Sequence, residues 1–293
     1  GDVVSSATAV SPMRAWQGFL HRHVGIRIAG LLALPMTWLI LLYVLPLAML
    51  FVSAFWTTDS FTGAVVRAFT LENFQRLFTD PAYITVALRT LGVAVAVTLL
   101  CLVLAVPIGF FMARVATARW QPLLVALMLT PLWASYLVKV YAWRVIFSPE
   151  GGVLASTLGF SPGFGWVAVV IVLTYLWLPY MILPVHVGMQ NVPQSLLDAS
   201  SDLGASSMRT FRQVLLPIVF PSLVAGSIFT FSLSLGDYIT VQLVGGKAQM
   251  LGNVVYQSFS TDLPFAAAVA SMTVLIMIGY LTAVRRTGAL ENL

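Results

Sequence analysis

Long apolar runs separated by short polar segments dominate the chain. A helix needs roughly 20 apolar residues to cross a bilayer, because each residue advances it by about 1.5 Å. Several of the runs contain proline, which is tolerated in a membrane where neighbouring helices satisfy the freed carbonyl groups. The pattern therefore predicts an all-α polytopic membrane protein of kinked, bundled helices. Six transmembrane helices are expected, over residues 28–55, 84–113, 121–147, 165–188, 214–236 and 264–284.

Two connecting segments are longer than the rest. Residues 56–83 are mixed in charge, whereas residues 237–263 contain the moderately apolar piece "MLGNVVYQSF". That piece is too short to cross a membrane. We expect it to form a re-entrant or interfacial helix.

Composition strengthens the membrane interpretation. Hydrophobic residues make up 59% of the 293 residues and charged residues only 9%, whereas soluble domains contain about 25% charged residues. The net charge of +5 does not indicate a nucleic-acid partner, because the basic residues lie at the ends of apolar runs. Cys101 is the only cysteine, which excludes a disulfide framework. No cluster of His, Asp or Glu predicts a metal site.

The distribution of Lys and Arg predicts the orientation, since cytoplasmic loops carry an excess of them. With the N-terminus in the cytoplasm, the external loops hold Arg67, Arg76 and Lys247. We then expect a cytoplasmic segment over 1–27, a transmembrane domain over 28–284 and a cytoplasmic tail over 285–293. The cytoplasmic side holds the larger set, Arg14, Arg22, Arg27, Arg114, Arg119, Arg209, Arg212, Arg285 and Arg286.

A polar stretch, "DASSDLGASSMRTFRQVLLP" at 198–217, interrupts the apolar runs. Pro193 can open a helix, and Gly204 can end it in the left-handed conformation. Ser206 or Ser207 can cap a second helix, which carries an apolar stripe. The stripe comprises Met208, Phe211 and Leu215. The expected structure is two short helices at an angle, lying along the cytoplasmic membrane surface before Pro217.

The spacing of this stretch resembles the "EAA" loop of ATP-binding-cassette (ABC) importer permeases. Asp198-Ala199-Ser200 is followed by three residues, Gly204, nine residues and Val214-Leu215-Leu216-Pro217. Asp replaces Glu, Ser replaces the second Ala and Val replaces Ile, and the shorter Asp side chain reaches less far. The resemblance implies a coupling loop over 190–217 that docks on an ATPase subunit. The implied contact residues are Asp198, Ala199, Gly204, Arg209 and Pro217.

Three further stretches are similar to the B-type permeases of bacterial spermidine/putrescine importers. They are "TLENFQRLF" (70–78), "WASYLVKVYAWRVIFSPEGGVLASTLG" (133–159) and "SLGDYITVQLVGG" (234–246). The resemblance implies the type I, MetI-like importer fold in the bacterial inner membrane, in contact with lipid. It also implies two ATPase subunits, a second related permease and an extracytoplasmic solute-binding protein. The Gly-x-x-x-x-Gly-Lys-Ser/Thr motif is absent, so we expect ATP and Mg²⁺ on the partner ATPases, and neither enzymatic activity nor a cofactor in this chain.

Asp237 is the only acidic residue near the apolar interior, at the outer end of the fifth run. For a polyammonium cargo, a carboxylate and aromatic faces are the expected binding groups. The candidate aromatic residues along the path are Trp133, Tyr136, Tyr141, Trp143, Tyr175, Trp177, Tyr180 and Tyr238. Each of them is equally compatible with an interfacial belt or a bundle core.

Asp237 is equally compatible with an ion pair to one of three cations in the outer halves of the second and third runs. These are Arg89, Lys139 and Arg144. If they face the cavity unpaired, they favour an anionic or zwitterionic solute. Another small cationic or organic solute also stays open.

Two other classes of protein are weaker interpretations. A stand-alone secondary transporter or channel predicts intramembrane acids for ion coupling or inverted repeats. Only Asp237 and no repeat are found. A membrane enzyme needs clustered His, Asp or Glu at the membrane face, and the ten acidic residues lie mostly in loops.

Overall fold

The computed structural model describes residues 24–288, without the side chains of Val24, Ile26 and Arg27. Expectations for residues 1–23 and 289–293, including those for Arg14 and Arg22, lie outside the described residues. The chain divides into two compact units after Val52.

The first unit contains one long apolar helix. It consists of α2 (Val24–Leu39), the π-helical turn η1 (Ile40–Val44) and α3 (Leu45–Ser53). Proline cannot donate to the carbonyl four residues earlier, and its ring crowds that carbonyl. For Pro46 this carbonyl belongs to Leu42, inside the wider π-turn. The helix therefore continues past Pro46. The segment Ile28–Ser53 is long enough to cross a membrane.

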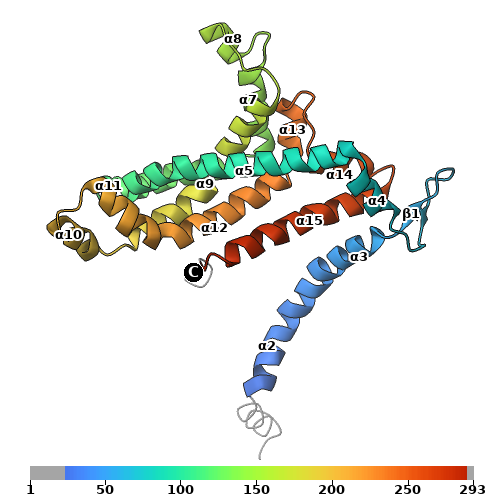
Figure 1. Cartoon of the computed structure of the whole chain (residues 1–293), viewed down its shortest axis with the longest axis horizontal. Coiled ribbons are helices and arrows are strands. Elements are labelled where there is room, and N and C mark those ends of the chain that lie inside the picture. The colour runs from blue at the N-terminus through green and yellow to red at the C-terminus, as the bar shows by residue number, and fades with distance from the viewer. Residues whose placement is uncertain (1–23, 289–293) are drawn as a thin grey trace, which may run out of the picture. The chain divides into compact units, whose positions relative to one another are not determined.

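Three long helices form the centre of the second unit (Figure 1). They are α5 (Pro81–Phe110), α9 (Trp166–Gln190) and α12 (Leu216–Leu235), and each packs against the other two. Gly226 lets α9 and α12 approach closely, because a Cβ atom there would lie 2.6 Å from the sulfur of Met181. Fully buried side chains from α5 and α9, such as Val97 and Leu173, fill the core.

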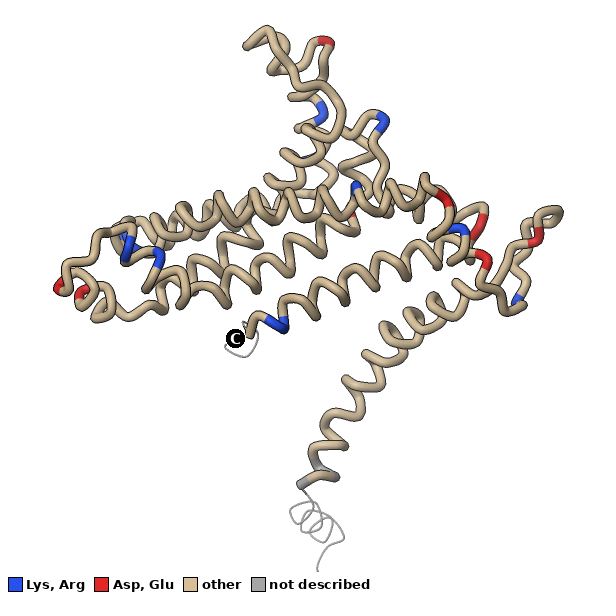
Figure 2. Tube along the Cα trace, in the orientation of Figure 1, with Lys and Arg blue, Asp and Glu red and all other residues tan. Residues whose placement is uncertain are grey.

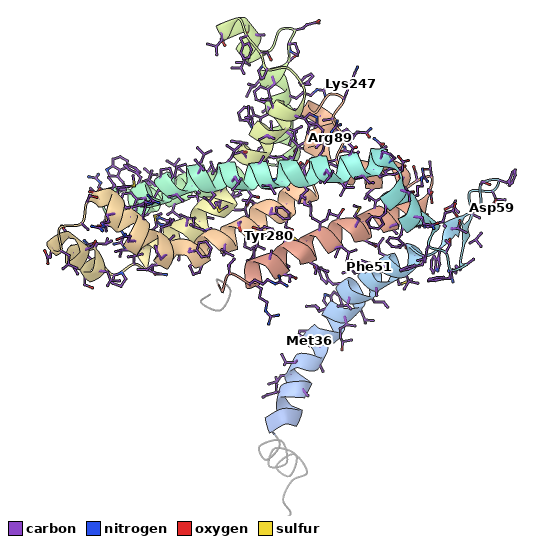
Figure 3. The ribbon with its side chains drawn as sticks, in the orientation of Figure 1. Met36, Phe51, Asp59, Arg89, Lys247 and Tyr280 are labelled. Atoms are coloured by element: carbon purple, nitrogen blue, oxygen red, sulfur yellow. The ribbon has the colours of Figure 1, made fainter. Side chains whose placement is uncertain are left out.

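A fourth long helix, α15 (Leu263–Arg285), packs against α12. Tyr280 lies between them: its ring stacks on Phe231 at 4.1 Å, and its hydroxyl donates to Ser227 Oγ at 2.6 Å (Figure 3). Charged residues gather at the ends of the long helices rather than along them (Figure 2). The interior of the bundle is thus largely apolar, and the hydroxyl groups of Tyr280 and Ser227 link two of its helices.

The predicted third span is not one helix. Residues 121–147 form α6 (Gln121–Trp133) and α7 (Tyr136–Phe147), which meet at an angle of 90°. Ala134 and Ser135 are extended between them. The Nζ atom of Lys139 donates to the carbonyl of Pro131 at 2.9 Å. A side chain of α7 therefore supplies the hydrogen-bond donor for a carbonyl group in the last turn of α6. This contact stabilises a sharp bend where the apolar run predicted a kinked but continuous helix.

The number of spans agrees with the prediction. Among residues 24–288, five helices are long and apolar enough to cross a membrane, and the bent pair makes a sixth if it counts as one span. The five are Ile28–Ser53, Pro81–Val115, Trp166–Gln190, Ser207–Leu235 and Leu263–Arg285.

Shorter elements fill the connecting segments. Residues 56–83 form a hairpin of β1 (Thr57–Thr58) and β2 (Val65–Val66), with Thr57 opposite Val66, followed by α4 (Glu72–Thr79). The N–H groups of Thr62 and Phe61 bind Asp59 in the hairpin turn and lower the pKa of that exposed carboxyl. The remaining elements are η2 (Phe111–Val115), α8 (Val153–Leu158), α13 (Ile239–Val244) and α14 (Leu251–Ser258).

The helix α14 is the short helix that the sequence predicts within residues 237–263. It has 8 residues and packs against α15. Asn253 in its first turn bonds the backbone N–H of Met250 at 3.1 Å and the carbonyl of Tyr238 at 3.0 Å. This side chain therefore ties α14 to the residue that directly precedes α13.

Candidate functional site

The coupling loop, residues 190–217, begins as the spacing predicts. The helix α10 (Gln194–Asp202) starts directly after Pro193 and ends at Leu203. Gly204 has a φ of +75°, a left-handed conformation that favours glycine. The predicted turn at Gly204 is confirmed.

The second half of the coupling loop differs from the prediction. The helix α11 (Ser207–Thr210), the π-turn η3 (Phe211–Leu215) and α12 are continuous, so no separate surface helix precedes the fifth span. Pro217 has no N–H to donate to the carbonyl four residues earlier, which is that of Gln213 and lies inside η3. The wider turn therefore carries the helix past Pro217 without a break. Ser206 caps the helix by accepting from the N–H of Arg209 at 3.4 Å.

A polar contact joins the two helices of the coupling loop: the hydroxyl groups of Ser200 on α10 and Thr210 on α11 lie 2.8 Å apart. Within α10, Gln194 Nε2 donates to Asp198 Oδ1 at 3.0 Å. All five predicted contact residues are exposed, which leaves them free to meet another protein. They are Asp198, Ala199, Gly204, Arg209 and Pro217.

At the other end of α12, Asp237 is buried, with 6% of its surface exposed. Its Oδ1 accepts from the N–H of Thr240 at 2.9 Å. Its Oδ2 accepts from the hydroxyl groups of Thr240, at 3.1 Å, and of Tyr136. Asp237 thus joins the first turn of α13 to α7.

None of the three nearby cations pairs with Asp237. Lys139 binds the carbonyl of Pro131, Arg144 donates to the carbonyl of Leu243 at 2.8 Å, and Arg89 lies 5.9 Å over the ring of Trp166. The one ion pair among the side chains that the structure describes joins Arg76 to Asp262, at 3.6 Å, and does not involve Asp237. Asp237 is therefore a buried acid surrounded by neutral donors, and the expected ion-pair alternative is not the arrangement found.

Aromatic rings wall the space beside Asp237. Tyr136 and Trp177 stack with centroids 6.0 Å apart, and Tyr180 meets Trp177 edge-on at 5.9 Å. The Nε1 atom of Trp177 is buried and has no hydrogen-bond partner in the described part of the chain. A hollow of about 200 Å³ opens here, lined by Tyr136, Trp177, Leu233, Gly236, Asp237, Tyr238 and Ile239. We call it the outer hollow.

Five of the eight candidate aromatic residues do not line the outer hollow. Trp133 is 89% exposed beside the bend between α6 and α7, and Tyr141 is exposed on α7. Trp143 and Tyr175 form a pair of their own, with centroids 5.3 Å apart. Tyr180 meets Trp177 but does not line the hollow. The structure thus brings only three of the eight candidates, Tyr136, Trp177 and Tyr238, to the hollow with Asp237.

Thr240 is a buried hydrogen-bond partner of Asp237 that sequence reasoning missed. It supplies two donors to Asp237 and its hydroxyl lies 2.8 Å from that of Tyr136. The signal was the spacing of three residues between Asp237 and Thr240, which is typical of an acid at a helix N-terminus. No group of three His, Cys, Asp or Glu within residues 24–288 is placed to hold a metal ion.

Comparison with known proteins adds independent findings. The family described as "Binding-protein-dependent transport system inner membrane component" matches residues 105–286. The inner membrane ABC transporter permease protein YdcU of Escherichia coli (strain K12) is 38% identical, over 94% of each chain. The spermidine/putrescine transport system permease protein PotB of the same strain is 34% identical, over 83% of this chain and 90% of PotB.

Solved structures show the same fold at low sequence identity. A chain of a bacterial alginate ABC transporter, in complex with a periplasmic protein, superposes with a TM-score of 0.67 at 12% identity. That match covers 95% of this chain and 98% of the other. A chain of the MetNI methionine ABC transporter gives a TM-score of 0.56 at 21% identity, over 71% of this chain and 97% of the other.

These findings confirm the predicted resemblance to ABC importer permeases. They also confirm the all-α, multi-pass fold and the location in the inner membrane. The chain belongs to the family of binding-protein-dependent transport system inner membrane components.

Proposed function

We propose that the chain is a permease subunit that imports a polyamine, with the outer hollow as part of its path. The observation that carries the proposal is Asp237, a buried acid whose partners are neutral hydroxyl and amide donors. A buried carboxylate without a cation is costly, so the ammonium group of a cargo would compensate it. Spermidine and putrescine, the cargoes in the name of the relative PotB, carry such groups.

The aromatic walls fit the same cargo. Ammonium groups are attracted to the faces of Trp and Tyr rings within about 6 Å. Tyr136, Trp177 and Tyr238 line the outer hollow beside Asp237, and the rings of Tyr136 and Trp177 stack on each other. Lys139 and Arg144, which would repel a cation, bind backbone carbonyl groups instead. The outer hollow is therefore suited to a cationic solute.

Import needs an energy source, which the coupling loop would connect. With the N-terminus in the cytoplasm, the exposed residues of the loop face the cytosol, where two ATPase subunits would hold ATP and Mg²⁺. A second related permease would complete the path, and a solute-binding protein would deliver the cargo outside. ATP shifts the transporter between outward-facing and inward-facing states only if it binds one of them more tightly.

A competition assay tests the choice of cargo. The complete transporter, with its ATPases, second permease and binding protein, is reconstituted in proteoliposomes, and ATP-dependent uptake of labelled putrescine and spermidine is measured. We expect uptake that unlabelled polyamines suppress and that amino acids, sugars and oxyanions do not. Import of an anionic or neutral solute in place of polyamines would overturn the proposal.

A further inference from the structure

Arg114 connects two helix ends at the predicted cytoplasmic side. It lies in η2, the π-turn that ends α5. Its Nη2 atom donates to the carbonyl oxygen of Met189 at 2.6 Å and also to that of Val192. Its Nη1 atom donates to Gln194 Oε1 at 3.3 Å. One guanidinium group thus joins the end of α5 to the end of α9 and to the first turn of α10.

The two carbonyl groups need this donor because of the local sequence. In a continuing helix, Met189 would accept from the residue four positions later, but that residue is Pro193, which has no N–H. The N–H of Leu196 bonds Pro193 rather than Val192. Met189 and Val192 are both buried. Without Arg114 their carbonyl groups would lack a partner, which is unfavourable in a buried position.

The hydrogen bonds continue into the coupling loop. Gln194, which accepts from Arg114, donates through Nε2 to Asp198 Oδ1 at 3.0 Å. Asp198 is the acidic residue at the start of the spacing that resembles the EAA loop. A chain of side-chain contacts therefore runs from α5 through Arg114 and Gln194 to the exposed carboxylate of the loop.

We propose that Arg114 is a positioning residue that makes the coupling loop move together with α5 and α9. The inference rests on the proposed function, since it requires the loop to meet the ATPases. When an ATPase subunit displaces α10, the guanidinium group would transmit the movement to α5 and α9. Without it, the turn around Pro193 could change shape and the two spans would stay in place. Hydrogen-bond networks and rigid helices are among the structures that carry coupling between distant sites.

The chemistry of the side chain makes the proposal specific to arginine. A guanidinium group donates through a rigid planar fork to several acceptors at once, whereas a lysine ammonium is a compact charge on a flexible stem. Lysine at position 114 would keep the cation near the C-terminus of α9, where it is favourable. It would not hold Met189, Val192 and Gln194 in one geometry.

The test compares Arg114→Ala and Arg114→Lys in the complete reconstituted transporter, with Arg119→Ala as the matched control. Arg119 lies in the same segment, is exposed and has no hydrogen bond or ion pair among the described residues. The readout is the amount of solute imported per ATP hydrolysed. Because coupling free energies correspond to roughly 5- to 150-fold effects, we expect this ratio to fall about tenfold for Arg114→Ala. Arg114→Lys should give an intermediate ratio, and Arg119→Ala the wild-type ratio.

A merely structural role gives a different result. Less assembled complex, with a normal ratio in what remains, would overturn the inference. If Arg114→Ala does not assemble, Arg114→Lys carries the test, and a wild-type ratio there would also overturn it. Gln194→Ala, an exposed change that removes the hydrogen bonds to both Arg114 and Asp198, should lower the ratio about threefold, a smaller effect than loss of the Arg114 side chain.

Gly204→Val separates this inference from the proposed function. If that variant imports normally, the loop itself has no coupling role. If it is inactive while both Arg114 variants keep the wild-type ratio, the loop couples to ATP hydrolysis and only the role of Arg114 is wrong.

Discussion

The coupling loop and the outer hollow lie at opposite ends of α12 and are built in different ways. The five predicted contact residues of the loop fall within 20 consecutive positions and are all exposed. The hollow takes Tyr136 from α7, Trp177 from α9 and Asp237 from the segment after α12, and Asp237 is buried. A surface that a partner must recognise can be encoded in local spacing. A hollow exists only after helices distant in sequence have packed together.

The largest expected effect falls on the coupling loop. In Gly204→Val, a β-branched residue would have to adopt a φ of +75°, which costs an L-residue roughly 1–2 kcal/mol or more. A Cβ atom there meets nothing within 4 Å, so the strain lies in the backbone alone. We expect membrane insertion to stay normal and ATP-driven uptake to be abolished, as measured by membrane fractionation and by transport in proteoliposomes.

Gly204→Asn is the matched control, because asparagine enters the left-handed region more readily than other residues. It should keep a large part of the uptake. Equal loss in both variants would mean that the side chain, rather than the turn, is what the partner cannot accommodate.

The second effect tests the outer hollow. Asp237→Asn keeps the volume of the side chain but removes its charge and one acceptor facing Tyr136 and Thr240. Hydrogen bonds to charged groups contribute about 1.5–3 kcal/mol, so polyamine uptake should fall roughly tenfold to a hundredfold. Asp59→Asn, on the exposed hairpin, serves as control. Co-purification with the ATPases should be unchanged, and unaltered uptake kinetics would leave Asp237 with a structural role only.

A smaller effect is expected for Tyr136→Phe. This change removes the hydroxyl that donates to Asp237 and keeps the ring that stacks on Trp177. Because the two donors of Thr240 stay on the carboxyl group of Asp237, we expect only about a threefold loss in uptake, at the lower end of the contribution of one hydrogen bond. Tyr141→Phe removes a hydroxyl from an exposed position of the same helix and should leave uptake unchanged. Equal behaviour of the two variants would argue against a special role of the Tyr136 hydroxyl.

The smallest effect is expected for Trp133→Ala. Trp133 is 89% exposed and lies outside the outer hollow. We expect uptake within about twofold of the wild type, as is usual for surface changes away from packed features. A large loss, measured in the same proteoliposome assay, would extend the path to Trp133 and thus to a surface that another subunit completes.

Much of the fold follows from the sequence because hydropathy and proline positions are local properties. Six apolar runs predict the spans, and Gly204 predicts the turn in the coupling loop. The bend between α6 and α7 could not be predicted in the same way. Pro131 indicates a kink, but the break falls at Ala134 and Ser135, where Lys139 supplies the donor from the following helix.

The outer hollow was predictable only in part. Asp237 stands out as an acid near the apolar interior, and eight aromatic residues were plausible neighbours. Which of them meet Asp237 depends on the direction of α7 after the 90° bend. The bend turns Tyr136 toward Asp237 and leaves Trp133 exposed, so the selection is a property of tertiary structure.

The π-turn η3 has a consequence for labelling experiments. Successive residues of an α-helix are rotated by about 100°, and a π-turn places one additional residue in its turn. An ideal helical wheel puts Met208 and Leu215 on one stripe, yet Met208 is 66% exposed and Leu215 only 2%. Cysteine pairs for crosslinking across residues 211–215 should therefore be chosen about one position out of the ideal register. The background for such a series needs replacement of a single native thiol, the buried Cys101.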